Sequence, residues 1–399
     1  MADLSQKTER RGSRRDSAAR PYRVAGILSL LVLLTAAAAL LFLPKQTYSA
    51  AEKRALAEMP PVNAENLLNG DFMSGADDYA ADHFPFRDYW MRLRVNTMRL
   101  LGETESQGVY YGRDGSLIRR FRPYEEEKAA DTAGAVRSFA ASHDFERKIF
   151  LAVPTSVSLY PENLPAYAEN ASETEFIRLF TEPLRDTFKV PDTAGILERM
   201  KQDGTALYYR SDHHWTTPAA YGTFTALKEE MNWRQTELRP AVVCNDFLGS
   251  LAAKSGFTPA EKDEIILYEE TDPDARIFVI HDASAVTSDS LYAPEALAGP
   301  DPYTVFLGGN EPLLTIRTTA DTERTLLLFK DSYANCFLPF LTGSYKTITV
   351  VDARYYSEPV SSLFLQADYT DLMFLYNVQT LAEDESLAIV LRDVAEERP

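Results

Sequence analysis

Two short segments, more than a hundred residues apart, carry side chains that could perform nucleophilic catalysis. The first reads Ser-Asp-His-His-Trp over residues 211–215 and holds two of the five histidines of the chain. The second reads Lys-Asp-Ser-Tyr over residues 330–333 and directly follows an apolar run. A carboxylate, an imidazole and a hydroxyl at the end of a strand are the parts of a hydrolase or acyltransferase triad, which is recognised by geometry and not by chain order. Asp212, His214 and Ser332 are therefore the candidate catalytic residues.

The spacing within the first segment suits an acid–base pair. Asp212 and His214 are two residues apart, so on an extended backbone both side chains point to the same side. The aspartate can then hold one ring nitrogen of His214 and leave the other nitrogen free to act as a general base. Thr217-Pro218 predicts a helix start just beyond, because proline is favoured at the first helical position after a threonine cap. A helix start favours the neutral imidazole, which is the form that a base needs.

The serine of the second segment has two interpretations. Ser332 becomes a nucleophile only with a base in reach. A helix that begins at about Tyr333 would point backbone N–H groups at the site, where they could stabilise an oxyanion. The alternative is that Ser332 only caps this helix, since serine is a preferred cap residue.

A metal site is the chief rival interpretation of the first segment. Adjacent Asp and His residues also occur as ligands in metal-dependent phosphoesterases. Such a site needs further ligands, and the remaining histidines, His83, His143 and His281, lack useful spacing. The Asp-Pro-Asp stretch at residues 272–274 reads as a turn. We therefore expect neither a metal nor an organic cofactor.

Downstream of about residue 125, helical and strand-like stretches alternate. Residues 129–142 have a helical composition, and short apolar runs typical of buried parallel strands recur. The runs lie at residues 148–153, 277–280, 305–307, 326–329, 348–351 and 372–376. This pattern predicts an α/β domain with a mostly parallel sheet that helices cover on both faces. In such sheets, sites form at the carboxyl ends of the strands, which is where Ser332 falls.

The first 43 residues have the pattern of a membrane anchor. Residues 1–23 contain seven basic and three acidic side chains, and residues 24–43 contain no charge. About twenty apolar residues span a bilayer as a helix, and the basic flank predicts a cytoplasmic N-terminus. The alternative is a cleaved signal peptide, whose apolar core is typically shorter. We expect a single-pass cell-membrane protein with residues 1–23 as a cytoplasmic basic tail, residues 24–43 as the transmembrane helix and the main domain outside the cytoplasm.

The region outside the anchor is expected to have two parts. Residues 44–125 would form a juxtamembrane, N-terminal subdomain, and residues 126–399 the catalytic domain. The first part contains a predicted helix from Trp90 to Leu100 and a predicted β-hairpin over residues 108–115.

Composition excludes some partners. The formal net charge is −18, and removing the basic tail leaves about −22 on the rest. Nucleic-acid binding depends on Lys and Arg that neutralise phosphates, so we expect no nucleic-acid partner. The same charge disfavours acidic polymers. Cys244 and Cys336 are too few for a disulfide framework or a four-cysteine zinc site, and we expect buried free thiols.

The segment Asp212-His213-His214-Trp215 resembles the signature of the DHHW family of bacterial membrane-anchored proteins. That family is related to the SGNH-hydrolase-like alginate O-acetyltransferases, whose signature is Asp-x-His-Trp. Other segments that resemble the family follow in order at residues 52–56, 82–88, 108–112, 153–155, 306–310, 330–333 and 352–356. The resemblance implies a three-layer α/β/α SGNH-hydrolase-like domain.

The resemblance also assigns roles to the three candidate residues. It makes Asp212 the orienting acid, His214 the base and Ser332 the nucleophile. The chain departs from the related patterns at two positions. Lys330 stands where the familiar Gly-Asp-Ser block has glycine, and His213 stands where the alginate enzymes often have threonine.

Residues around these motifs are candidates for stabilising an oxyanion or binding the substrate. Gly309, Asn310 and Asn377 are candidate oxyanion donors, the last because it ends an apolar run. The other candidates are neighbours of the motif residues, namely Asp331, Tyr333, His213, Trp215 and Arg354. Aromatic side chains here could stack on sugar rings, although most aromatic residues pack in cores.

The activity implied by the resemblance is serine-dependent transfer of an acetyl group to a cell-surface or secreted polysaccharide. The partners would be a polysaccharide acceptor and an acetyl donor, or a membrane protein that supplies the donor. Two alternatives stay open: a carbohydrate acetyl esterase that uses the same triad, and a non-catalytic glycan-binding or assembly protein of the same fold.

Overall fold

The structure, a computed structural model, describes residues 22–32, 34–35, 38–39, 42, 45–49, 54–282 and 286–392. The chain divides into two compact units, Met1–Arg94 and Val95–Pro399. Residues 95–125 therefore lie in the same unit as the main sheet. The functional boundary expected after residue 125 stays a prediction.

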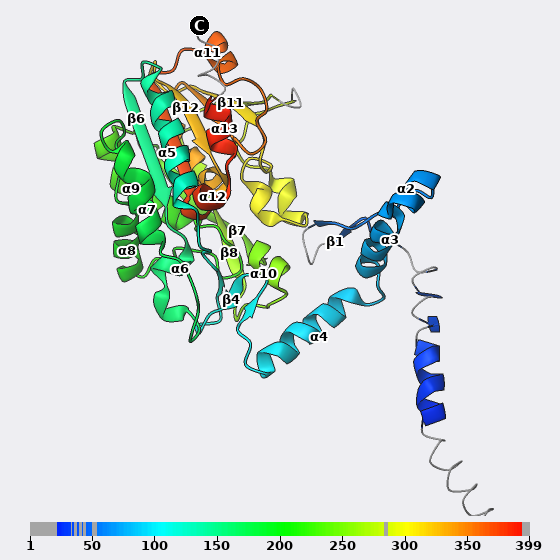
Figure 1. Ribbon diagram of the computed structural model, residues 1–399. Coiled ribbons are helices and arrows are strands. Elements are labelled where there is room, and N and C mark those ends of the chain that lie inside the picture. The colour runs from blue at the N-terminus through cyan, green and yellow to red at the C-terminus, as the bar shows by residue number, and fades with distance from the viewer. Residues whose placement is uncertain are drawn as a thin grey trace, which may run out of the picture. The chain divides into compact units, whose positions relative to one another are not determined.

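The smaller unit contains one short strand pair and helices. Strands β1 (Tyr48–Ser49) and β2 (Arg54–Ala55) are antiparallel, and helices α2 (Ala64–Asn69), α3 (Asp71–Asp82) and α4 (Arg87–Leu100) follow (Figure 1). Asp82 at the end of α3 accepts hydrogen bonds from the Arg54 guanidinium and the Ala57 amide, each at 2.8 Å. The bond from Arg54 is the main cause that lowers the pKa of Asp82 to about 2. Helix α4 confirms the helix expected from Trp90 to Leu100.

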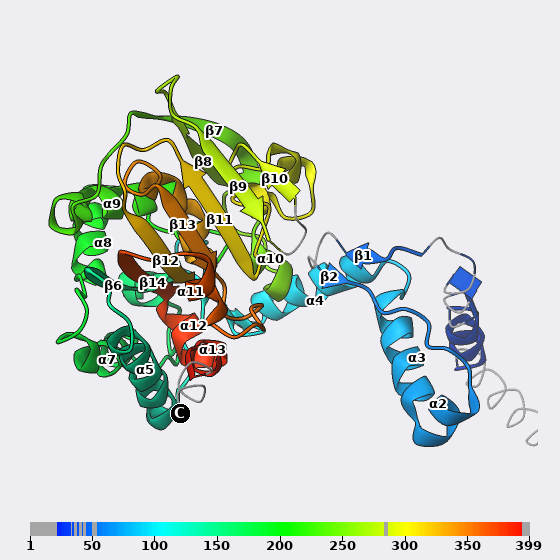
Figure 2. The same cartoon turned by 90° about the horizontal axis from the view of Figure 1, so that it is seen from above.

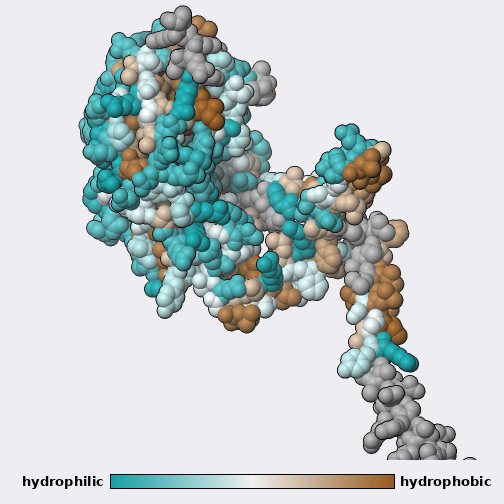
Figure 3. All heavy atoms as spheres, viewed as in Figure 1, coloured by the Kyte–Doolittle hydropathy of each residue, from teal (hydrophilic) through white to brown (hydrophobic). Residues whose placement is uncertain are grey.

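The predicted membrane anchor is described only in part. Residues 22–32 are helical, and their side chains are exposed, as the hydropathy colouring shows (Figure 3). Among the described residues, no helix is both long enough and apolar enough to cross a bilayer. Residues 33, 36, 37, 40, 41 and 43 of the expected span, and residues 1–21 of the expected tail, lie outside the described residues. The transmembrane helix therefore stays a prediction.

A seven-stranded sheet forms the centre of the larger unit, in the order β10-β9-β11-β13-β12-β14-β6 (Figure 2). Its strands are β6 (Arg147–Val153), β9 (Ile277–His281), β10 (Val286–Ser288), β11 (Leu313–Thr318), β12 (Thr325–Lys330), β13 (Thr347–Val351) and β14 (Asp371–Asn377). The four strands β13, β12, β14 and β6 run parallel, whereas β11, β9 and β10 join antiparallel. The α/β class is confirmed, but the sheet is mixed. Strand direction depends on the connecting segments, which apolar runs alone do not reveal.

Helices cover both faces of this sheet. On one face, α5 (Glu126–Ala141), α7 (Glu173–Thr181), α12 (Val378–Glu383) and α13 (Ser386–Arg392) pack against Leu327 and Phe329 of β12. On the other face, α8 (Thr193–Gln202) and α9 (Thr217–Met231) pack against Leu326 and Leu328. Alternate residues of β12 thus serve the two layers, as strand geometry requires. The face of this unit visible in Figure 3 is mostly hydrophilic.

Two smaller sheets and short helices complete the larger unit. The first sheet contains β3 (Glu105–Ser106), β4 (Val109–Tyr111) and β5 (Leu117–Arg119), and it confirms the hairpin expected over residues 108–115. The second is the antiparallel ribbon of β7 (Leu238–Phe247) and β8 (Asp263–Glu270). The short helices are α6 (Ser156–Leu159), α10 (Ser250–Ser255) and α11 (Ser362–Gln366), with 3₁₀ turns η1 (Pro161–Asn163), η2 (Glu182–Leu184), η3 (Pro294–Ala298), η4 (Pro302–Val305), η5 (Ser332–Cys336) and η6 (Leu338–Leu341).

Two local predictions were wrong. Residues 305–307 are not a strand, because Leu307, Gly308 and Gly309 all have positive φ and turn the chain after η4. The helix expected after Ser332 is a pair of short 3₁₀ turns, because Pro339 enters one turn later and interrupts a longer helix. Both cysteines are free thiols, as expected, although only Cys336 is fully buried.

The parallel strands bring the candidate residues to one edge of the sheet. Ser332 follows β12 directly, Asn377 ends β14 and pairs with Val153 at the end of β6, and Asp352 follows β13. The carboxyl ends of parallel strands share one edge, so these four positions are neighbours.

The core of the larger unit predicts a large stability difference between two phenylalanines. Phe374 of β14 is fully buried, and its ring centroid lies 5.1 Å from that of Phe329 and 5.6 Å from that of Phe150. Phe374→Ala should lower the free energy of unfolding by about 3–5 kcal/mol, because it leaves a cavity in a packed core. Phe278 of β9, which is 45% exposed, is the matched control. Denaturant unfolding of both variants tests this, and equal losses would contradict the packing.

Candidate active site

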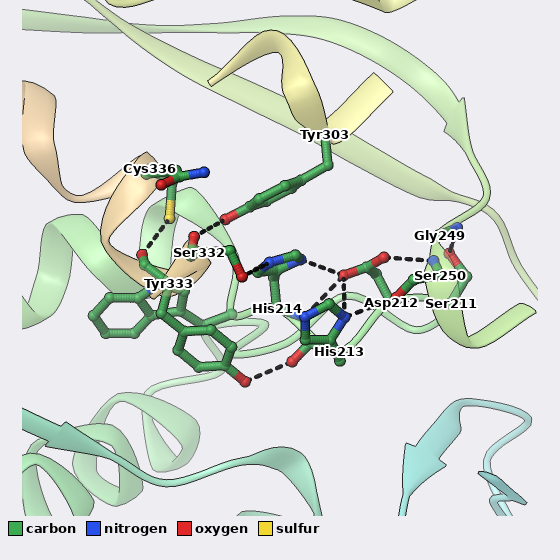
Figure 4. Close-up of polar contacts among 12 residues, drawn as sticks. Ser211, Asp212, His213, His214, Gly249, Ser250, Tyr303, Ser332, Tyr333 and Cys336 are labelled. Carbon is green, nitrogen blue, oxygen red and sulfur yellow. Dashed lines mark hydrogen bonds and ion pairs between the residues drawn. The ribbon is translucent and has the colours of Figure 1, made fainter. Parts of the chain in front are cut away.

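The loop before α9 presents Asp212 and His214 as a hydrogen-bonded pair (Figure 4). Asp212 Oδ1 accepts hydrogen bonds from His214 Nδ1 at 2.5 Å and from the His214 amide at 3.0 Å. Helix α9 begins at Thr217, and the cap is Thr216, one residue earlier than expected. The predicted position of His214, on a loop at a helix start, is correct.

The other oxygen of Asp212 is held by a distant segment. Its Oδ2 accepts a hydrogen bond of 2.6 Å from the amide of Ser250, the first residue of α10. Burial alone would raise the pKa of Asp212, but the imidazoles of His214 and His213 and the Ser250 amide hold this pKa well below its ordinary value. The carboxylate is therefore ionised at neutral pH and fixes His214 with Nδ1 as the donor.

Ser332 lies within hydrogen-bond distance of the free nitrogen of His214. The distance from His214 Nε2 to Ser332 Oγ is 2.7 Å, although 118 residues separate the two in sequence. Because Nδ1 donates to Asp212, Nε2 is the acceptor, and the serine hydroxyl donates to it. The structure thus brings the three candidate residues into one continuous chain of hydrogen bonds, with Ser332 93% buried.

Tyr303 of η4 forms a lid over the imidazole. Its ring stacks on that of His214 with a centroid distance of 3.7 Å and an interplanar angle of 10°. Its hydroxyl donates to the backbone carbonyl of Ser332 at 3.2 Å. Tyr303 therefore contacts both the candidate base and the segment of the candidate nucleophile, which limits the rotation of the ring.

His213 lies beside the pair and not within it. Its Nδ1 lies 2.7 Å from Ser250 Oγ, and its ring centroid lies 3.8 Å from that of His214. Burial, followed by the neighbouring charge of His214, lowers the pKa of His213 to about 3. Its side chain is one-quarter exposed, so it can border a bound molecule.

Trp215 and Tyr333 join the two motif segments. Trp215 Nε1 donates to the Tyr333 carbonyl at 2.9 Å, and the Tyr333 hydroxyl donates to the His213 carbonyl at 2.5 Å. Both side chains are completely buried. They cannot stack on a sugar in this structure, and they hold the two segments in register instead.

Asp331 and Asn377 form a buried clamp behind Ser332. Asp331 Oδ2 accepts from the Asn377 amide at 2.9 Å and from Asn377 Nδ2 at 2.7 Å, and Asp331 Oδ1 accepts from the Tyr333 amide. The second hydrogen of Asn377 Nδ2 bonds to Thr380 Oγ1 at 3.0 Å. Both donor hydrogens of the carboxamide are therefore engaged, and Asn377 has none left for an oxyanion without rearrangement.

The remaining candidates lie along the same sheet edge. Asn310 Oδ1 is bonded to Lys330 and Asn335, Gly309 precedes it in the turn after η4, and Arg354 forms two hydrogen bonds with Asp352 at 2.8 and 2.6 Å. No contact of these three residues with Ser332 or His214 is found among the described residues.

A metal ion would compete with the hydrogen bonds already present. Asp212, His213 and His214 offer ligand atoms that lie within 4.8 Å of one another. However, Nδ1 of His214 faces Asp212 and its Nε2 faces Ser332, so neither nitrogen is available without breaking the chain. The donor set of one carboxylate and two imidazoles fits an acid–base pair better than a metal centre.

Several supporting residues were missed from the sequence. Asp263 at the start of β8 accepts from the amides of Arg210 and Ser211 at 2.6 and 2.8 Å, and the Ser211 hydroxyl accepts from the Gly249 amide at 2.9 Å. Gly249, Ser250, Asp263 and Tyr303 lie far from both motifs in sequence, and no local pattern distinguishes them. Only the pairing of β7 with β8 brings residues 249–263 to the loop.

The comparisons with known proteins agree with this geometry. Residues 120–246 match the SGNH hydrolase-like domain of acetyltransferase AlgX, which defines the class of the fold and site. Residues 189–351, which include all three candidate residues, match the DHHW protein family. The chain therefore contains an SGNH-hydrolase-like domain and a DHHW domain, and the resemblance expected from the sequence is confirmed.

Solved structures share the fold at low identity. A DHHW family protein from Eubacterium siraeum is 22% identical, with a TM-score of 0.59, and the alignment covers 70% of this chain and 97% of that one. PatB1 from Bacillus cereus, in a structure with a sulfonyl adduct, is 18% identical, with a TM-score of 0.57 and the same coverage. No curated protein matches the chain significantly in sequence.

The contact between Gly249 and Asp212 predicts a sensitive position. A Cβ on Gly249 would overlap with Cβ and Oδ2 of Asp212, whereas a Cβ on Gly134 in α5 meets nothing within 4 Å. Gly249→Ala should displace the carboxylate and lower the free energy of unfolding by about 1–3 kcal/mol. Gly134→Ala should leave stability equal or slightly higher, because alanine is the better helix former. Thermal unfolding of both variants measures the difference, and equal stability would contradict the close approach.

The lowered pKa of His213 predicts a pH dependence of stability. An unfolded histidine has a pKa of about 6.5, so between pH 6.5 and about 3 the unfolded chain binds a proton that the folded chain does not. The contribution is complete above pH 6.5 and is lost as the pH falls. At pH 5 the loss would be at most about 2 kcal/mol, at about 1.4 kcal/mol per pH unit.

Comparison of the wild type with His213→Gln isolates this contribution. Urea unfolding at pH 7.5 and pH 5 should show a larger loss of stability for the wild type than for the variant. Equal losses would mean that His213 titrates normally in the folded protein.

Proposed function

We propose that this protein is a serine-dependent acyltransferase that moves an acetyl group to a hydroxyl of a cell-surface or secreted polysaccharide. The observation that carries this proposal is the hydrogen-bond chain from Asp212 through His214 to Ser332. A buried carboxylate, an oriented imidazole and a hydroxyl in reach form the constellation that activates a serine. The match to the domain of acetyltransferase AlgX supports acetyl as the group that is transferred.

In the first half of the proposed reaction, Ser332 Oγ attacks the carbonyl carbon of an acetyl ester or thioester donor. His214 Nε2 takes the hydroxyl proton, and Asp212 stabilises the imidazolium that forms. When the tetrahedral intermediate collapses, the bond to the donor breaks and His214 returns the proton to the leaving group. The product of this half-reaction is an acetyl ester on Ser332.

In the second half, a sugar hydroxyl replaces the donor. His214 takes the proton of this hydroxyl while its oxygen attacks the acetyl carbon, and Ser332 leaves and regains the proton. The acetyl ester now lies on the sugar, and the enzyme is unchanged. No step needs a metal or an organic cofactor.

The amide of Ser332 is placed to stabilise the negative charge on the carbonyl oxygen. Ser332 is the first residue of η5, and Asp331 caps this turn by accepting from the Tyr333 amide at 2.9 Å. Among the hydrogen bonds of the described residues, none uses the Ser332 amide as a donor. A donor that is fixed in place and unengaged is what an oxyanion requires.

The setting of this reaction follows from the sequence. We propose a single-pass anchor at residues 24–43, with residues 1–23 in the cytoplasm and the catalytic domain outside it. The acetyl donor would then come from a membrane protein or another source at the cell surface. The acidic chain is not suited to nucleic acid as a partner.

The decisive experiment uses Ser332→Ala and an exposed serine as the control. The full-length protein in detergent is offered p-nitrophenyl acetate, with and without an acceptor oligosaccharide, and products are identified by mass spectrometry. Ser332→Ala should lose at least about a thousandfold in rate, because the other groups cannot form the covalent intermediate. Ser138→Ala on α5 should retain full activity.

Each other outcome separates a rival function. Acetate formation without sugar acetylation would identify an acetyl esterase, which the same three residues could support. A sulfonyl fluoride should label Ser332, in line with the sulfonyl adduct in the PatB1 structure. Absence of both turnover and labelling in the wild type, with glycan binding that Ser332→Ala leaves unchanged, would identify a non-catalytic glycan-binding protein.

A further inference from the structure

Lys330 is an unusual residue in its position. It ends β12 only two residues before Ser332, and its side chain is completely buried. Residues two apart on a strand point to the same face, so Lys330 lies on the face of Ser332 and not on that of Asp331. A buried ammonium beside a candidate nucleophile needs a reason, because burying a charge is costly unless it is paired and hydrogen-bonded.

The surroundings of Lys330 satisfy its ammonium completely. The Nζ atom lies 3.0 Å from Asn310 Oδ1, 2.9 Å from Asn335 Oδ1 and 3.2 Å from Asp352 Oδ2. An ammonium has three N–H donors, and here each donor meets one acceptor. Burial lowers the pKa of Lys330, and the buried carboxylate of Asp352 opposes that shift. The three acceptors come from three separate segments of the chain.

This arrangement determines how the carboxamide of Asn310 is turned. Its Oδ1 accepts from Lys330 Nζ and also from Asn335 Nδ2 at 3.1 Å, so both oxygen lone pairs are occupied. The oxygen must face these two donors, and the amide nitrogen faces away from them. Among the described residues, Asn310 Nδ2 donates to no protein acceptor, and the side chain is exposed. Asn310 therefore presents two fixed N–H donors to whatever lies beside it.

The geometry of η5 relates Asn310 to Ser332. In a 3₁₀ helix, side chains three residues apart eclipse each other, so Asn335 and Ser332 lie on one face of η5. Asn310 contacts Asn335 on that face. The turn through Leu307, Gly308 and Gly309, all with positive φ, brings Asn310 there from η4, which carries Tyr303 over His214.

We propose that Lys330 is a positioning residue that, with Asn335, turns the amide nitrogen of Asn310 toward the carbonyl oxygen of the acyl group on Ser332. Asn310 then supplies the second donor of an oxyanion site whose first donor is the Ser332 amide. The cation on Oδ1 also polarises the carboxamide, which strengthens its N–H groups as donors. This inference rests on the proposed acyl transfer, and it gives a physical role to the lysine that replaces glycine before Asp331-Ser332.

Two substitutions at Asn310 separate a donor from a structural contact. Asn310→Ala removes both the oxygen that Lys330 binds and the N–H donors. Asn310→Asp keeps an oxygen for Lys330 and loses only the donors. With p-nitrophenyl acetate and the full-length protein, both variants should lose about a hundredfold in kcat, the usual effect of removing one oxyanion donor, with KM within about twofold. Full activity of Asn310→Asp would overturn the donor role.

The role of Lys330 is tested by a double-mutant cycle. Lys330→Met is combined with Asp352→Asn, because removing one partner of a buried ion pair leaves an uncompensated charge that could prevent folding. This pair of substitutions should lower kcat about tenfold or more when Asn310 is present. In the Asn310→Ala background it should lower kcat no more than about twofold, because the group it positions is already absent.

Controls distinguish the possible failures. Lys346→Met, an exposed lysine, should leave kcat unchanged, and thermal unfolding shows which variants remain folded. Equal losses from the Lys330 and Asp352 substitutions in both backgrounds would overturn the positioning role. An active wild type with an unaffected Asn310→Ala rejects only this inference. A wild type that neither turns over nor is labelled by a sulfonyl fluoride rejects the proposed function first, and this inference with it.

Discussion

The ionised carboxylate of Asp212, buried to 98%, is the constraint on which the candidate site depends. A buried charge without hydrogen bonds would be strongly destabilising, so its two oxygens must be satisfied within the protein. They are satisfied by the ring and amide of His214 on one side and by the Ser250 amide on the other. Satisfying this one carboxylate therefore orients the imidazole, and it ties the loop before α9 to the start of α10.

A second buried aspartate extends the same principle outward. Asp263 accepts from two backbone amides and from the Ser211 hydroxyl, and Ser211 in turn accepts from the Gly249 amide. The ribbon of β7 and β8 carries Gly249 and Asp263 to the loop, so its antiparallel pairing has a direct consequence for the position of Asp212. The position of His214 thus depends on a shell of backbone contacts that reaches well beyond the motif residues.

The sequence was sufficient for the residues that carry chemistry and insufficient for those that hold them. Asp212, His214 and Ser332 could be found because their types are rare in such patterns and because apolar runs placed Ser332 at a strand end. Gly249, Ser250, Asp263 and Tyr303 act through single tertiary contacts, and a glycine, a serine or a tyrosine in a loop has no local signature of such a role. The antiparallel half of the sheet was missed for a related reason, since strand direction is a property of connections between distant segments. The strand expected at residues 305–307 failed because apolar composition does not reveal a positive φ.

The nucleophile segment is held from both neighbouring strands, and the alternation of β12 explains how. Successive residues point to opposite faces, so Asp331 and Lys330 face different layers. Asp331 reaches Asn377 at the end of β14, and Lys330 reaches Asp352 at the end of β13. Replacing either contact with apolar packing would cost little stability in general, because buried ion pairs are weak net stabilisers. Their value here is directional, since hydrogen bonds of opposite sense on two faces leave the short turn that carries Ser332 with one position relative to His214. A helix dipole could not provide this, because η5 has only five residues.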